Sequence, residues 1–257
     1  MNKRELVKEF VHKHRYFTLE DVVKATGGSN QLAKNYLQDL KQAGIVFSAG
    51  RGVYSSVTKE FQLVEKNRVA EIRQLLKKKF PHLNFLVWNT LCFQPYYHHQ
   101  QTHNITFVEV ESDAILSVVD EISHKYRFVM IEKASCVASK DFDITRDPIV
   151  VKLLIKSSPR KGHIPTLEKM LVDLFMIKNK YATMQDSDYW ELWRSIDELF
   201  RVNIGVLITY ARARRYLRDI LLQLTDNVGL SNVTFGAYVK YAAKVTSKKD
   251  RHDKANS

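Results

Sequence analysis

Residues 29–57 read SNQLAKNYLQDLKQAGIVFSAGRGVYSSV, and this stretch joins a helical pattern to a hairpin pattern. At about 100° per residue, its apolar side chains fall in one sector of a helix, namely Leu32, Ala33, Tyr36, Leu37, Leu40 and Ala43. Gly44 ends that helix, and apolar and small residues then alternate on both sides of Gly50-Arg51-Gly52. Alternation around a glycine-rich tip predicts a β-hairpin.

The residues before Ser29 predict two further helices. An apolar stripe with helical spacing indicates the first helix, over Leu6, Val7, Phe10 and Val11. Thr18, with Asp21 three residues later, is a variant of the capping box that opens the second helix. The Gly27-Gly28 pair ends it, and Ser29 caps the third. Three helices followed by a hairpin predict that residues 1–58 form a winged helix-turn-helix.

The rest of the chain predicts an α+β domain and a helical region. An amphipathic helix is expected from residue 59 to about residue 80, before Pro81. Strand-like runs follow at NFLVWNT, ITFVEVE, YRFVMIEK and IVVKLLIK, with a helix from Asp113 to His124, so residues 59–160 form an α+β domain around a mixed sheet. Residues 161–245 are expected to be helical, and residues 246–257 a polar, disordered tail. The expected C-terminal helices are Pro165–Tyr181, Asp188–Phe200, Val202–Leu224 and a short one at Thr234–Ala243.

Composition restricts the class of protein. Two cysteines, Cys92 and Cys136, are too few for a disulfide framework or a four-cysteine zinc site. The chain opens MNKREL, without the apolar core of a signal peptide, and no apolar run reaches the ~18 residues that span a bilayer. A cytoplasmic protein is therefore expected, and an integral membrane protein is not.

The net charge of +12 favours a polyanionic partner. The predicted third helix is a candidate double-stranded DNA reader, because Asn and Gln pair with adenine edges while Lys reaches guanine or phosphate. The hairpin adds Arg51, a cation on a narrow tip that can enter a minor groove. A solvated helix face and a plain turn are the alternatives. The candidate DNA-binding residues are Ser29, Asn30, Gln31, Lys34, Asn35, Gln38, Lys41 and Arg51.

Other polar groups are weaker candidates for a site. Four arginines are expected on one flank of the Val202–Leu224 helix, as a phosphate or partner contact or a solvated edge: Arg212, Arg214, Arg215 and Arg218. Asp147 and Lys156 are placed like residues of a restriction-nuclease core, but Leu154 stands where that core needs its second acid. Lys152 and Lys156 then indicate a half-exposed strand.

No cofactor or metal site is expected. His98, His99 and His103 lie close in sequence, but no cysteine or suitably spaced acid completes a set of four ligands. Cys92 and Cys136 lack a CxxC spacing and are expected to be small buried side chains.

Two segments resemble the antitoxins of abortive-infection, type IV toxin-antitoxin systems. One is AGIVFSAGRGVYS, which closes the wing with Gly50 to Tyr54, and the other is HIPTLEKMLVDLF, His163 to Phe175, with YARARRYLRDIL continuing the likeness. The resemblance implies an N-terminal winged helix that binds repeats in its own promoter and represses the operon. It implies a nucleotidyltransferase-type toxin as the functional partner, countered without a stable complex, and no catalysis by this chain. A nuclease-fold protein targeted by a winged helix, or a protein-binding adaptor, stays open beside it.

Overall fold

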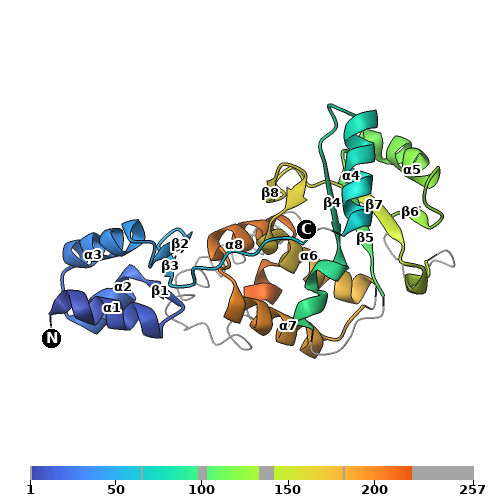
Figure 1. Cartoon of the computed structure of the whole chain (residues 1–257). Coiled ribbons are helices and arrows are strands. Elements are labelled where there is room, and N and C mark those ends of the chain that lie inside the picture. The colour runs from blue at the N-terminus through green and yellow to red at the C-terminus, as the bar shows by residue number, and fades with distance from the viewer. Residues whose placement is uncertain (1, 65, 98–102, 133–141, 182, 222–257) are drawn as a thin grey trace, which may run out of the picture. The chain divides into compact units, whose positions relative to one another are not determined.

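The structure, a computed structural model, describes residues 2–64, 66–97, 103–132, 142–181 and 183–221 (Figure 1). Within these residues the chain forms two compact units. Unit 1 contains the described residues up to Glu60 and those from Asp197 onward, and unit 2 contains the described residues from Phe61 to Ile196. Helices and small sheets make this an α+β fold, as expected. The domain boundaries given above stay a prediction.

The first elements of unit 1 are α1 (Lys3–Lys13), β1 (Tyr16–Thr18) and α2 (Leu19–Thr26). The expected capping box of α2 is confirmed: the Asp21 amide donates to Thr18 Oγ1 over 3.2 Å, and the Thr18 amide donates to the Asp21 carboxylate over 2.7 Å. Gly27, at φ +58°, ends α2 in the left-handed conformation that glycine adopts without strain. The helix bounds therefore follow from local backbone chemistry.

Helix α3 (Asn30–Gln42) begins where Ser29 Oγ accepts a hydrogen bond from the Leu32 amide over 3.3 Å. Its buried side chains, Ala33, Leu37 and Leu40, belong to the predicted apolar stripe. They pack with side chains of the two preceding helices in one core, made of Val7, Val11, Phe17, Val22, Ala33, Leu37, Leu40 and Val46. Burial of this stripe leaves the opposite face of α3 exposed.

The predicted hairpin is present as β2 (Phe47–Gly50) and β3 (Val53–Ser55). Its tip requires glycine twice, because φ is +136° at Gly50 and +76° at Gly52. β1 pairs antiparallel with the other side of β3, so that the sheet order is β1-β3-β2. β1 was not predicted, since three residues are too few to establish an alternating pattern.

The C-terminal part of unit 1 contains the end of α7 (Asp186–Leu199) and α8 (Ile204–Ala213), and α8 lies beside β2 (Figure 1). The prediction of one continuous helix from Val202 to Leu224 is wrong, because α8 ends at Ala213 and helical residues resume only at 217–221. Arg215 then adopts φ +65°, a left-handed conformation that interrupts a right-handed helix. The expected helix at Thr234–Ala243 and the tail lie outside the described residues.

Unit 2 opens with α4 (Asn67–Lys79), which is shorter than predicted. The expected start at residue 59 is wrong, since residues 56–64 are not helical. The Phe61 ring stacks on Phe93, with ring centroids 6.1 Å apart, and the Val64 side chain is 71% exposed. The apolar residues before Asn67 therefore do not continue the buried face of the helix.

The predicted mixed sheet is confirmed in unit 2. Its strands are β4 (Phe85–Asn89), β5 (Thr106–Val110), β6 (Val129–Ile131) and β7 (Ile149–Leu153), in the order β4-β5-β7-β6. β4 pairs antiparallel with β5, whereas β7 is parallel to both β5 and β6. The register sets Glu109 of β5 opposite Lys152 of β7.

The two faces of this sheet bury different kinds of side chain. Val87, Val108 and Val151 pack in one core with α4 and α5 (Ile115–Ser123). Because side chains alternate along a strand, Trp88, Glu109 and Lys152 point to the other face. There they meet α6 (Leu167–Lys180). Lys169 of α6 contacts Glu109 and the Trp88 ring, and Lys152 pairs with Asp173 of α6.

Short elements complete unit 2. They are the 3₁₀ turns η1 (Thr90–Tyr96), η2 (Ser112–Ala114) and η3 (Ile144–Arg146), and the two-residue strands β8 (Arg160–Lys161) and β9 (Ile164–Pro165), which pair just before α6. The Tyr189 hydroxyl of α7 donates to the Leu171 carbonyl of α6 over 3.0 Å. Across the described ranges, no helix combines the length and the apolar character needed to cross a bilayer.

Candidate nucleic-acid interface

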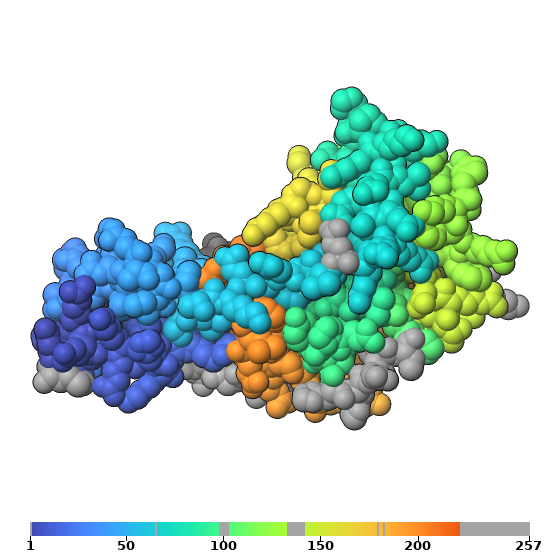
Figure 2. Space-filling view, in the orientation of Figure 1, coloured from blue at the N-terminus to red at the C-terminus, as the bar shows by residue number. Residues whose placement is uncertain are grey.

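The exposed face of α3 carries all the polar residues that the sequence selected there. The side chains of Gln31, Lys34, Asn35, Gln38 and Lys41 are exposed, as is Asn30 at the first position of the helix. Figure 2 shows this helix uncovered along one edge of unit 1. Ser29 is also exposed, but its hydroxyl is the acceptor that caps the helix. The fold therefore brings these candidates onto one open helix face.

Two amides on this face are already joined. Gln31 Nε2 donates to Asn35 Oδ1 over 3.0 Å, a one-turn spacing along the helix. A bidentate contact with adenine needs both the amide oxygen and the amide nitrogen of an asparagine. The bond from Gln31 uses one of the two acceptor sites of the Asn35 amide oxygen, whereas no bond of this kind engages Gln38 among those described.

The single acid on the margin of the face, Asp39, is paired. Its carboxylate lies 3.5 Å from the Arg4 guanidinium of α1, and both side chains are about half exposed. An exposed pair of this kind contributes little to stability. It does, however, reduce the repulsion that a free carboxylate would exert on a phosphate backbone.

The hairpin places Arg51 between Gly50 and Gly52, with its side chain exposed. This tip is not isolated, because the sheet is contacted by the C-terminal part of unit 1. The Arg201 guanidinium lies 3.9 Å from the centre of the Phe47 ring, at the start of β2. Gly205 of α8 approaches the backbone of Gly50 at the other end of that strand. Nothing in the hairpin sequence indicated these contacts.

A second set of contacts that the sequence did not reveal joins β1 to residues 197–202. The Tyr16 hydroxyl accepts a hydrogen bond from the Val202 amide over 3.0 Å, and Arg15 Nη1 donates to the Glu198 carbonyl over 2.9 Å. Asp197 lies 3.6 Å from Arg15 Nε. Burial raises the pKa of Asp197, and burial, followed by the Asp197 charge, raises the pKa of Tyr16 well above its usual value. These contacts of Arg15 and Tyr16 attach residues 197–202 to the start of β1 and have a structural role.

The four arginines of the C-terminal segment do not share one helix flank, which corrects the prediction. Arg212 belongs to α8, Arg214 caps its end, and Arg215 lies in the left-handed turn that separates Arg218 from α8. Arg212, Arg215 and Arg218 are exposed. Because α8 ends before the turn at Arg215, these side chains do not form the continuous basic edge of a single helix.

The interior of unit 2 contains a cluster of four charges, Glu109, Lys152, Lys169 and Asp173, called here the buried tetrad. Lys169 Nζ lies 2.6 Å from Glu109 and 2.5 Å from Asp173, and Lys152 Nζ lies 3.6 Å and 3.7 Å from the same two carboxylates. Trp88 Nε1 donates to Glu109 over 3.0 Å. Burial lowers the pKa of Lys169, but the attraction of Asp173 and Glu109 outweighs it, so the pKa is raised.

The tetrad bears on the nuclease alternative. Lys152 is 5% exposed, so the prediction of a half-exposed strand is wrong for this residue. Lys156 lies beyond the end of β7, and Asp147 accepts a hydrogen bond from the Asn104 amide over 3.1 Å. Asp147 and Lys156 are thus not members of the tetrad. One signal in the sequence could have indicated the buried tetrad, namely an acid, Glu109, within the strand-like run ITFVEVE.

The other candidates for chemistry are not assembled into a site. Among the described residues, no group of three or more His, Cys, Asp or Glu side chains could hold a metal ion. His98, His99 and Cys136 lie outside the described residues. Cys92 lies 3.9 Å from the Met170 sulfur, and burial raises the pKa of its thiol, so the reactive thiolate is disfavoured.

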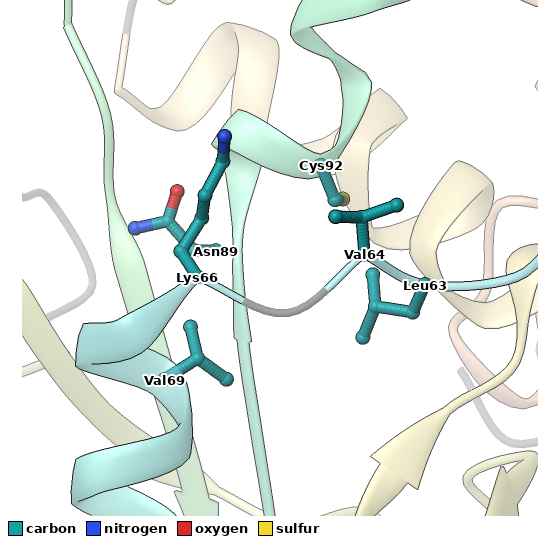
Figure 3. Close-up of a pocket in the computed structure, with 6 residues that line it drawn as sticks. All are labelled: Leu63, Val64, Lys66, Val69, Asn89 and Cys92. Atoms are coloured by element: carbon teal, nitrogen blue, oxygen red, sulfur yellow. The ribbon is translucent and has the colours of Figure 1, made fainter.

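A small hollow lies beside the N-terminus of α4 (Figure 3). It is lined by Leu63, Val64, Lys66, Val69, Asn89 and Cys92. The hollow has room for about one water molecule. The Asn89 side chain is engaged in local structure, because its Oδ1 accepts a hydrogen bond from the Leu91 amide and its Nδ2 donates one to Thr106.

A comparison with protein-family models places the chain in a family. No curated protein matches the chain. The model of a family of unknown function, DUF6577, matches residues 32–229, which is more than half of the 257 residues and begins within α3. The chain therefore belongs to the family of unknown function DUF6577.

Proposed function

We propose that this chain is a DNA-binding transcriptional regulator in which residues 1–58 form a winged helix. Helix α3 is the recognition helix, and the β2–β3 hairpin is the wing. One observation supports this more than any other: an exposed row of amide and lysine side chains runs along a helix whose other face is buried. That row has the donors and acceptors that major-groove base edges require.

The proposal extends to the antitoxin role that the sequence resemblance implies. The protein represses its own operon by binding promoter repeats and counters a nucleotidyltransferase-type toxin encoded alongside, without a stable complex. It acts in the cytoplasm and carries out no catalysis itself. The net charge of +12 and the Gly-Arg-Gly tip support a polyanionic partner, whereas the toxin rests on the resemblance alone.

A gel-shift experiment tests DNA binding. The full chain is titrated into its own upstream DNA and into a scrambled duplex of the same length, at about 50 to 200 mM salt. We expect tighter binding to the upstream DNA and affinity that falls with salt. No shift at the lowest salt would refute DNA binding and favour the adaptor, and metal-dependent cleavage would favour the nuclease.

Co-expression tests the antitoxin role separately. The adjoining reading frame is expressed alone and together with this chain, and growth is followed. We expect a nucleotidyltransferase-like product that arrests growth and an arrest that this chain relieves. An unrelated neighbour, or an arrest that persists, would contradict the antitoxin role while leaving DNA binding in place.

A further inference from the structure

Gly205, in the first turn of α8, touches the tip of the hairpin. A Cβ atom on Gly205 would lie 2.8 Å from Gly50 Cα and 3.6 Å from the Arg51 amide nitrogen. The approach to Gly50 is an overlap with a backbone atom, which no side-chain rotation can relieve, whereas the distance to Arg51 is an ordinary contact. Gly205 belongs to the helix and has no positive φ, and glycine is a poor helix former compared with alanine. The close approach of two backbones is therefore the physical reason for glycine at this position.

The same C-terminal segment holds the other end of β2. The Arg201 guanidinium stacks on the Phe47 ring at 3.9 Å, its Nη1 donates to the Val57 carbonyl over 3.5 Å, and its Nη2 forms an ion pair with Glu60. The Arg201 amide also donates to the Lys59 carbonyl over 2.8 Å. Residues 201 and 205 thus contact the first and last residues of β2.

The opposite edge of this sheet is held as well. In the order β1-β3-β2, β1 and β2 are the two edge strands. Tyr16 of β1 accepts the Val202 amide hydrogen bond, and the neighbouring Arg15 binds the Glu198 carbonyl. Residues 197–205 therefore contact both edges of the three-stranded sheet, and the hairpin is a supported element with its tip against α8.

We propose that Gly205 is a positioning residue for nucleic-acid binding: by admitting the hairpin tip against α8, it sets the place at which Arg51 meets the phosphate backbone. This inference rests on the proposed function. It assigns residues 197–205, distant in sequence from α3, to the DNA-binding apparatus.

The test compares the full-length chain with Gly205→Ala and Gly205→Val, and uses Thr209→Ala as the matched control. Thr209 is exposed one turn further along α8, and its hydroxyl donates to the Gly205 carbonyl. Hydrogen exchange of the amides in residues 47–55 reports the hairpin without DNA. Affinity for upstream DNA over a range of salt reports binding, and thermal unfolding reports stability.

In both Gly205 variants we expect faster exchange in the hairpin and retained unfolding cooperativity. Affinity should fall about tenfold and the salt slope by about one unit, the value of one lost phosphate contact. Thr209→Ala should leave all these values unchanged. Unchanged exchange and affinity in Gly205→Ala and Gly205→Val would overturn the proposal.

A double-variant cycle separates positioning from a purely structural role. If Gly205 acts through Arg51, then Arg51→Ala should cause no further loss of affinity in the Gly205→Ala background. Additive losses would overturn the proposal. If the unaltered chain binds no DNA, the proposed function fails, and the role of Gly205 in binding fails with it. If it binds and Gly205→Ala binds equally well, only the present inference fails.

Discussion

The Lys169 ammonium lies 2.5 Å from the Asp173 carboxylate, one turn apart on α6, and neither side chain is more than 1% exposed. Glu109 approaches the same ammonium from the sheet at 2.6 Å. A buried ion pair loses hydration on folding, and removing one partner leaves an uncompensated charge in the interior. The buried tetrad therefore connects α6 to β5 and β7 through charges that depend on one another.

Lys169→Met should destabilise unit 2 by about 3 to 5 kcal/mol, because it leaves two carboxylates with Lys152 as their one remaining cation in the tetrad. Thermal and urea unfolding would measure this loss. Lys156→Met, at an exposed lysine, serves as the control. The pKa of Lys169 is raised in the folded state. Its contribution to the free energy of unfolding is therefore complete below the pKa of about 10.4 that lysine has in the unfolded chain, and it is lost as pH rises above that value. An unchanged unfolding midpoint would contradict this role.

Asn35→Ala and Gln38→Ala should each cost about 1 to 3 kcal/mol of binding free energy at a matched DNA site and relax base preference there. The reason is that each removes an amide able to pair with a base edge. Competition binding against single-base variants of the site would measure the effect. Equal losses on matched and random DNA would show that these amides do not read sequence.

Lys34→Ala and Lys41→Ala should weaken binding to all sequences alike. Each lysine is expected to contact a phosphate, and each loss should lower the salt slope by about one unit. Affinity measured at several salt concentrations, on matched and random duplexes, provides the check. A sequence-selective loss, or a slope that does not change, would argue against backbone contacts.

Arg51→Ala should weaken DNA binding while the free energy of unfolding changes by no more than about 0.5 kcal/mol, the usual range for a surface substitution. The two glycines that the turn needs stay in place. Titration of DNA and thermal unfolding of the same preparation would separate the two effects. Joint loss of affinity and stability would mean that Arg51 supports the wing instead of contacting DNA.

Tyr16→Phe should lower the free energy of unfolding by about 1 to 3 kcal/mol, because the buried Val202 amide loses its acceptor. The pKa of Tyr16 is raised in the folded state. Its contribution to the free energy of unfolding is therefore present below the pKa of about 10 that tyrosine has in the unfolded chain, and it is lost above that pH. The variant should therefore lose less stability between about pH 9 and pH 11 than the unaltered chain. Identical pH profiles would exclude Tyr16 as a source of this dependence.

Local signals were enough to predict most of the elements. The Thr18 and Ser29 caps, the Gly27 and Gly44 stops and the glycine tip of the hairpin all act within a few residues, so α2, α3, β2 and β3 follow from the sequence. Short strand-like runs likewise predicted the four strands of the mixed sheet. The exposed face of α3 was predictable for the same reason, because burial of one stripe determines which side chains remain outside.

Tertiary contacts decided the rest. Periodicity predicted helices that start before Asn67 and continue past Ala213, but Phe61 packs on Phe93 and Arg215 takes a left-handed conformation. The strand pattern predicted that Lys152 is half exposed. In the structure α6 covers this residue, and Asp173 of α6 pairs with both Lys152 and Lys169.

By itself the sequence determined the caps, turns and apolar stripes of this protein, since these depend on residues a few positions apart. It did not determine that Gly205 meets Gly50, or that Glu109 meets Lys169. Each of those contacts joins positions many residues apart. It is stabilised by tertiary packing or by the burial of opposite charges together, and a local sequence pattern carries no information about either.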